Sequence, residues 1–279
     1  MAAETISAGT RPADLSGGGS LLGRTYCRAV VEQIDQVTPK MRLIRLTGPD
    51  LGGLSWTPGQ QVRVCVRERS GPVLTGRVLR SYSVWKYDGG GLELCVLDHG
   101  DGPGARWARG LRPGDRVLFR KPQGSFVTVP GAPYHLFAGE ETASVAFGAM
   151  LRALPGDAAI YGVVEVASPA HRLPLPRSAQ LEWWYRGVES PVESASLVAA
   201  IAELDLPAEP GVAYIAGEVR TCHVVHGLIG NGTRQPLRIS RGRFDFPAES
   251  TVGTSTCAPA SSARRTRSNV MAWSLSGKR

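Results

Sequence analysis

The rhythm of apolar residues changes near Pro133, and this change constrains the fold more than any other feature of the chain. Before it, short alternating segments are separated by glycine- and proline-containing turns, which is typical of a small antiparallel β-barrel. We expect those strands at residues 26–31, 41–46, 62–66, 79–86, 92–97 and 116–120, with a short helix at 105–109. After it, strand-like and helical segments alternate, which predicts a parallel sheet covered by helices on both faces. We expect strands at 134–138, 158–166, 181–185 and 212–216, and helices at 140–154, 194–204 and from about 221.

Composition divides the chain into four regions. We expect a flexible leader over residues 1–22, a β-barrel domain over 23–131, an α/β domain over 132–247 and a disordered tail over 248–279. The tail holds five basic residues and one acid, so it carries half of the net charge of +8. Its Ser, Thr, Ala and Arg content gives little apolar surface to offset chain entropy. The remaining positive charge is modest, which suits an anionic small molecule and argues against a nucleic-acid partner.

The sequence predicts neither membrane insertion nor a metal held by the protein itself. No apolar run approaches the ~20 residues that span a bilayer, and residues 1–20 lack a charged-then-apolar signal pattern. We therefore expect a cytoplasmic protein, and a monomer as the simplest state. The five cysteines are widely spaced and include no C-x-x-C pair, so no disulfide framework, zinc site or iron–sulfur site is favoured.

The segment Arg80-Ser81-Tyr82-Ser83-Val84 carries the most informative chemistry. In an extended segment Arg80 and Tyr82 share one face, while Ser81 and Ser83 share the other. A guanidinium can grip a phosphate with two hydrogen bonds, and a phenol ring can stack on a flat heteroaromatic ring. About fifteen residues later the run HGDGPGARWA leads into a helix, whose first amides can contact a second phosphate. These groups suit a dinucleotide with a large planar ring, and a flavin is the obvious choice.

These motifs also carry a family resemblance. RSYSV resembles the flavin-binding signature of the ferredoxin-reductase superfamily. HGDGPGARWARGLRPGDRV, FAGEETA and YIAGEVRTC, in that order, resemble the siderophore-interacting proteins, which are FAD-dependent ferric-siderophore reductases. The resemblance covers roughly residues 24 to 228. It implies a ferredoxin-reductase-like fold, with an antiparallel FAD-binding barrel followed by a parallel-sheet domain of the nicotinamide-binding type.

The resemblance also implies roles for particular residues. Arg80 would hold the FAD pyrophosphate, Tyr82 would stack on the isoalloxazine, and Ser83 would lie near its reactive nitrogen. The remaining cofactor contacts would be Ser81, His99, Gly100, Gly102, Pro103, Ala105, Glu141, Thr142, Ala143, Gly217 and Glu218. His99 is given a contact role without acid–base chemistry, no residue is assigned as catalytic, and Trp107 is expected in core packing rather than on the cofactor.

The implied electron donor is NADPH or NADH, with ferredoxin as an alternative, and the implied acceptor is a ferric siderophore. Lys86 and Arg241 are the predicted substrate contacts, chosen from basic residues that also include Arg63, Arg120 and Lys121. Arg172, Arg186 and Arg220 each follow an expected strand and could meet a cofactor phosphate or simply be solvated or paired. A non-enzymatic or impaired flavoprotein that binds a chelate is the rival interpretation, and a ferredoxin-linked flavin reductase of the same superfamily is a further alternative.

The chain departs from the family pattern after about Gly230. Siderophore-interacting proteins usually continue with a strand and a Trp-containing turn near the flavin, whereas residues 236–246 read PLRISRGRFDF. A natural variant and a change of reading frame both fit this departure. Either would alter the wall that closes the substrate pocket.

Overall fold

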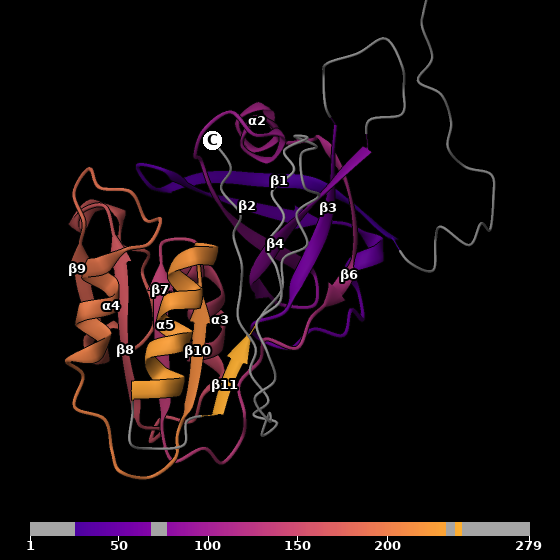
Figure 1. The fold of residues 1–279 in the computed structure, drawn as a ribbon. Coiled ribbons are helices and arrows are strands. Elements are labelled where there is room, and N and C mark those ends of the chain that lie inside the picture. The colour runs from indigo at the N-terminus through magenta and orange to yellow at the C-terminus, as the bar shows by residue number, and fades with distance from the viewer. Residues whose placement is uncertain (1–25, 68–76, 233–237, 242–279) are drawn as a thin grey trace, which may run out of the picture.

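The computed structural model describes residues 26–67, 77–232 and 238–241, which form an antiparallel barrel beside a parallel sheet (Figure 1). The predicted fold class is confirmed, and each expected strand is present. The expected leader and tail, residues 1–22 and 248–279, lie outside the described residues. No helix in the described ranges is both long and apolar enough to cross a bilayer.

Six strands close the barrel in the order β1-β2-β5-β4-β3-β6. Their bounds are β1 Tyr26–Thr38, β2 Met41–Thr47, β3 Gln61–Arg67, β4 Arg77–Tyr87, β5 Gly91–Leu97 and β6 Arg116–Gln123. Alternate residues of each strand point inward, and apolar side chains fill the barrel interior; Val62, Val64 and Phe119 are fully buried there. The 3-10 turn η1 (Pro49–Leu51) follows β2, and the helix α2 (Pro103–Gly110) covers one end of the barrel (Figure 1).

The second sheet has the order β11-β10-β7-β8-β9, and all its pairings are parallel. Its elements are β7 His135–Glu140, α3 Ala143–Ala153, β8 Ile160–Val166, η2 Pro169–His171, η3 Ser178–Gln180, β9 Glu182–Tyr185, α4 Ala195–Ala202, β10 Val212–Ala216, α5 Val219–Gly232 and β11 Arg238–Arg241. Side chains alternate between the faces of the central strands. In β7, Phe137 packs in the cluster that contains α3, whereas Leu136 and Ala138 pack with α4 and α5. Both faces are therefore covered, as predicted.

Two local predictions differ from the structure. The helix expected from residue 140 begins at Ala143, because Glu140 is still in β7 and pairs with Glu165 of β8. The acids expected in the first helical turn therefore precede the helix. The strand β11, which the sequence analysis did not predict, adds to β10 and ends at Arg241.

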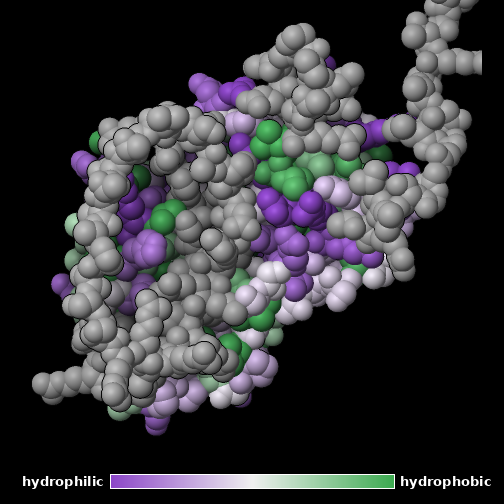
Figure 2. Space-filling view, turned by 45° about the vertical axis from the view of Figure 1, so that its right-hand side comes forward, coloured by the Kyte–Doolittle hydropathy of each residue, from purple (hydrophilic) through white to green (hydrophobic). Residues whose placement is uncertain are grey.

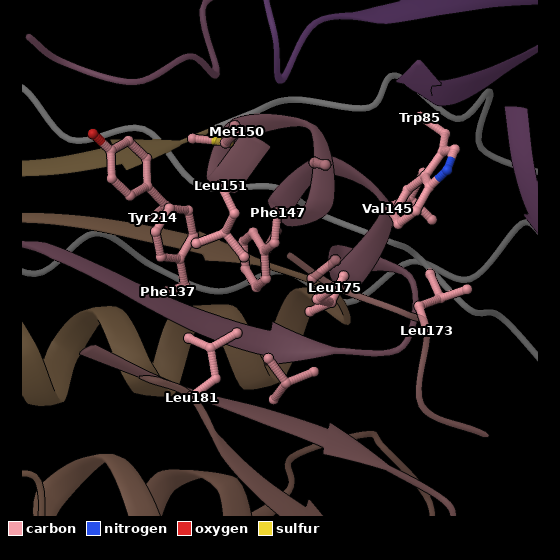
Figure 3. Close-up of a cluster of buried hydrophobic side chains, with 14 of the residues drawn as sticks. Trp85, Phe137, Val145, Phe147, Met150, Leu151, Leu173, Leu175, Leu181 and Tyr214 are labelled. Atoms are coloured by element: carbon pink, nitrogen blue, oxygen red, sulfur yellow. The ribbon is translucent and has the colours of Figure 1, made fainter. Parts of the chain in front are cut away.

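The barrel and the sheet share a hydrophobic core (Figure 3). Trp85, near the end of β4, packs against Val145 of α3, and Leu175 packs in the same cluster. A methyl group on Gly148 would lie 2.2 Å from the Trp85 ring, so the indole occupies the space above this glycine. Arg152 lies over the same ring, 4.5 Å from its centroid, and donates a hydrogen bond to the Trp85 carbonyl. Strand β4, which carries the RSYSV motif, is thus packed against α3 of the second domain.

Candidate functional site

Strand pairing places Arg80 and Tyr82 on one face of β4. Arg80 lies opposite Val64 and Tyr82 lies opposite Val62, and directly opposed residues of an antiparallel pair share a face. Both valines are fully buried in the barrel interior, so the two motif side chains lie on the side of β4 that faces that interior. The shared face predicted for Arg80 and Tyr82 is present.

Ser81 and Ser83 occupy the opposite face of β4, across from Arg63 and Gln61 of β3. Both serines are 6% exposed. The Ser81 hydroxyl and the Arg63 Nε are buried and have no hydrogen-bond partner among the described residues. Buried polar atoms are normally satisfied, and such an exception requires a structural or functional reason.

The first turn of α2 lies directly over Arg80 and Tyr82. A Cβ on Gly104 would lie 2.7 Å from the Tyr82 hydroxyl and 3.6 Å from Arg80 Cγ, so only glycine allows this approach. Arg106 donates the first backbone bond of the helix, to Gly102, and Pro103 has no N–H to donate. The amides of Gly104 and Ala105 therefore precede the first intrahelical bond, and such amides are the groups that bind phosphate.

The Tyr82 hydroxyl is buried under α2 and has no hydrogen-bond partner among the described residues. Burial raises its pKa well above the usual range, although the charge of Arg80 acts in the opposite direction. The Tyr82 ring is also stacked on Trp107 of α2, with centroids 5.4 Å apart and planes 28° apart. Trp107 packs against the barrel core, as predicted, but it also fixes one face of the ring expected to meet the flavin.

The His99–Gly100 loop leads into α2. Arg109 holds this loop, donating hydrogen bonds to the Gly100 carbonyl (3.1 Å) and the Asp101 carboxylate (2.7 Å). Desolvation lowers the pKa of the His99 imidazole, while the negative charges of Asp98 and Glu141 act to raise it.

Two glycines allow the ends of β7 and β10 to meet closely. A Cβ on Gly139 would lie 2.2 Å from the Ala216 carbonyl oxygen and 2.6 Å from the Ala143 methyl group. Gly217 has a φ of +126°, and a Cβ there would lie 3.0 Å from the Glu140 side chain. The predicted contacts around Ala143 and Gly217 are therefore neighbours at the carboxyl edge of the sheet, where ligands of open α/β sheets bind.

This edge is lined by buried acids. Glu140 accepts hydrogen bonds from the amide and the hydroxyl of Thr142, and burial together with the nearby Glu141 raises the pKa of Glu140 well above its usual range. Glu218 is also buried and accepts a hydrogen bond from the Thr221 amide (2.9 Å), so it stabilises the start of α5. Burial acts to raise the pKa of Glu141, but Arg186 and the Ala167 amide lower it below the usual range.

Arg186 joins three segments at this edge. Its Nη2 donates to Glu141 (2.7 Å), and its Nη1 lies 3.7 Å from the Glu165 carboxylate. The Arg186 side chain is 11% exposed, and Glu141 and Glu165 are 5% and 0% exposed. Glu165 also accepts hydrogen bonds from Ser194 and Ser196 at the start of α4. Sequence reasoning missed this network, since its members come from four separate segments and no local pattern marks them.

The other basic residues have different surroundings. Arg220 is exposed and forms a surface ion pair with Glu193 (3.6 Å). Arg172 is exposed and lies over the rings of Trp183 (4.9 Å) and Tyr185 (5.1 Å). Among the predicted substrate contacts, Lys86 is exposed beyond the bulge of β4, and Arg241 ends β11 opposite Ile215.

Comparison with known proteins agrees with these motifs. Residues 132–233 match the siderophore-interacting protein family, and residues 72–126 match the siderophore-interacting FAD-binding domain. The chain belongs to the siderophore-interacting protein family. The match ends at residue 233, close to Gly230, after which the sequence predicts a departure from the family pattern. The family resemblance inferred from the sequence is confirmed.

Three relatives illustrate this membership. An uncharacterized protein of Mycobacterium tuberculosis is 32% identical over 173 residues, covering 59% of this chain and 60% of the relative. Ferric vibriobactin reductase of Vibrio cholerae is 31% identical over 175 residues, covering 60% and 62%. The chain therefore spans about 60% of the length of these curated relatives. A solved siderophore utilization protein from T. fusca has 25% identity and a TM-score of 0.64, with 76% of this chain and 90% of that chain covered.

More distant solved structures share only the fold; they include phthalate dioxygenase reductase at 15% identity and the FAD/NAD-binding domain of nitric oxide dioxygenase from Vibrio cholerae at 20% identity. The residues at the barrel end fit an FAD molecule. They offer a guanidinium, two helix-start amides, an aromatic ring and an orphaned buried hydroxyl around Gly104, whose lack of a side chain lets α2 approach Tyr82 closely. On the face drawn in Figure 2, hydrophobic and hydrophilic residues lie side by side, so the described part of that face is mixed in character.

Proposed function

We propose that the chain is an FAD-dependent reductase that passes electrons from NADPH or NADH to a ferric siderophore and releases Fe(II). The observation that carries the proposal is the convergence of Arg80, Tyr82 and the first turn of α2. Its membership of a family with an FAD-binding domain and its similarity to a ferric vibriobactin reductase support it.

Each half of the molecule has a part in this proposal. Residues 23–131 would form the FAD domain, in which Arg80 and the amides of Gly104 and Ala105 would hold the pyrophosphate. Tyr82, backed by Trp107, would provide a flat surface for the isoalloxazine, and Ser83 would lie near its reactive nitrogen. Residues 132–247 would receive the nicotinamide donor at the strand ends around Gly139 and Gly217.

FAD, when bound, would accept the two electrons of a hydride and deliver them singly, which a ferric ion requires. The iron arrives inside its chelate, so the protein needs no ligands of its own for it. Reduction weakens the attachment of hard oxygen ligands to the metal, because Fe(II) is softer and less highly charged. Lys86 and Arg241 would attract an anionic chelate toward the flavin edge.

The test is reconstitution of the full chain with FAD, followed by an absorption spectrum and a reduction assay. We expect a flavin spectrum, bleaching of that spectrum by NADPH or NADH without oxygen, and formation of a ferrous complex when a ferric siderophore and a ferrous trap are added. Reduced ferredoxin serves as the alternative donor in a parallel assay. A protein that binds FAD but yields no Fe(II) with any of these donors would contradict the proposal and support a flavoprotein without turnover.

A further inference from the structure

We propose that Arg172, together with Trp183 and Tyr185, forms the subsite for a phosphorylated adenosine, so that NADPH is preferred to NADH as the donor. This inference rests on the proposed function, since it specifies the electron donor of that reaction. It starts from the three arginines that follow strands of the parallel sheet, which the structure separates into three distinct environments.

Arg186 is unsuited to bind an incoming phosphate. Its guanidinium is almost fully buried and already contacts the carboxylates of Glu141 and Glu165. A phosphate at this position would have to compete with two buried carboxylates and would meet their negative charge. Removing one partner of a buried ion pair also leaves an uncompensated charge, which is strongly unfavourable.

Arg220 is a weak choice for a different reason. It lies in the first turn of α5 and is paired at the surface with Glu193, at 3.6 Å. Buried Glu218 is only two residues away in the chain, so an incoming dianion would meet negative charge on this side as well.

Arg172 has the properties that the other two lack. It is exposed, and it makes no ion pair with a carboxylate in the part of the chain that the structure describes. Its guanidinium lies over Trp183 and Tyr185, and such stacking holds the cation in place while leaving its N–H groups open to solvent. Tyr185 is the last residue of β9 and is 42% exposed.

The position of Arg172 in the sheet also suits the binding of an adenosine phosphate. Arg172 follows β8 in a loop whose first residue, Ala167, donates its amide hydrogen to Glu141 at the carboxyl edge. A dinucleotide that crosses this edge toward the flavin motif would leave its adenosine at the outer strand, which is β9. There an aromatic surface can stack with a purine, and a planar guanidinium can bind a phosphate ester with two hydrogen bonds.

The test is calorimetric titration of the full, FAD-loaded chain with two small probes. 2′,5′-ADP carries the second phosphate and 5′-AMP lacks it. We expect 2′,5′-ADP to bind at least about tenfold more tightly than 5′-AMP, as a charge-assisted contact allows. R172Q should lose that difference, whereas R220Q, an exposed arginine of the same domain, should retain it. Y185A should weaken both probes, because both contain adenine.

Equal affinity for the two probes in the parent protein, or unchanged 2′,5′-ADP binding in R172Q, would overturn the inference. Equal losses in R172Q and R220Q would do the same, because the effect would then be general attraction. Neither probe requires flavin reduction or iron, so this result is independent of the proposed function. If the chain forms no Fe(II) but its binding of 2′,5′-ADP still depends on Arg172, the reductase proposal is overturned and the proposed adenosine subsite is retained.

Discussion

Replacing Gly148 by alanine tests whether the barrel and the sheet are fixed to each other through Trp85. The added Cβ would lie 2.2 Å from the Trp85 ring and 3.2 Å from Leu175. Contacts shorter than 3.0 Å are essentially absent for real Cβ atoms, so the ring would have to retreat by about 1 Å. Arg152 lies over one face of the indole and donates a hydrogen bond to the Trp85 carbonyl. Both contacts oppose movement of the ring away from Gly148.

Two opposing effects set the size of the change. Overpacking a well-filled core costs about 1–3 kcal/mol, and a rigid indole against backbone-attached carbon favours the upper part of that range. Alanine in place of glycine within α3 returns up to about 1 kcal/mol of helix stability. We therefore expect the free energy of unfolding to fall by about 2 kcal/mol, which corresponds to a decrease in Tm of roughly 4–8 °C for a domain pair of this size.

Thermal unfolding of a double-mutant cycle tests whether the loss of stability comes from the contact between the Cβ added at Gly148 and the Trp85 ring or from a general effect of the substitution at Gly148. In a Trp85→Leu background the clash is absent. Gly148→Ala should then leave the free energy of unfolding unchanged or raise it, whereas it lowers the free energy of unfolding in the parent chain. Gly156→Ala is the matched control, because nothing lies within 4 Å of a Cβ at that position. The same loss of stability from Gly148→Ala in both backgrounds would refute the reasoning.

Three further predictions concern the charged groups of the site. Arg80→Ala should weaken FAD binding by about 2 kcal/mol, or roughly thirtyfold, in a titration of the apoprotein, while exposed Arg112→Ala should not; equal affinities would show that Arg80 does not hold the pyrophosphate. Burial and Glu141 raise the pKa of Glu140 to about 8, so the folded chain binds more protons than the unfolded chain between about pH 4.5 and 8, and the free energy of unfolding from this group falls as pH rises through that window. Denaturant unfolding at several pH values should show that slope, and Glu140→Gln should remove it. Arg186→Leu should cost about 3–5 kcal/mol because it leaves two buried carboxylates unpaired, whereas Arg220→Leu, which breaks an exposed pair, should cost less than about 1 kcal/mol; similar costs would contradict the distinction between them.

The sequence predicts local features of this molecule well, because they depend on neighbouring residues. The alternation in β4 is enough to place Arg80 and Tyr82 on one face and Ser81 on the other, and strand pairing with β3 agrees. The glycine run before α2 likewise indicates a helix start near these residues, and the structure has one. Such features follow from backbone geometry that each segment carries by itself.

Contacts between distant segments could not be predicted in this way. Nothing near Glu140 in the sequence indicates that it extends β7, because that depends on pairing with Glu165 in β8. The stacking of Tyr82 on Trp107 depends on how α2 covers the barrel end. From the sequence, Arg172 and Arg186 look equivalent, since each follows an expected strand. Only the fold places Glu141 and Glu165 beside Arg186.

That separation of the two arginines explains how one edge of the sheet can serve both stability and binding. The carboxylates of Glu141 and Glu165 share one buried guanidinium, so their charges are largely compensated within the protein and their geometry is fixed by packing. Substitutions there should act mainly on folding. Arg172 is held by aromatic rings at the surface, so its loss removes a cation without leaving a buried charge unpaired. A change in donor binding without a change in stability is therefore the expected signature of Arg172, and the reverse is the expected signature of Arg186.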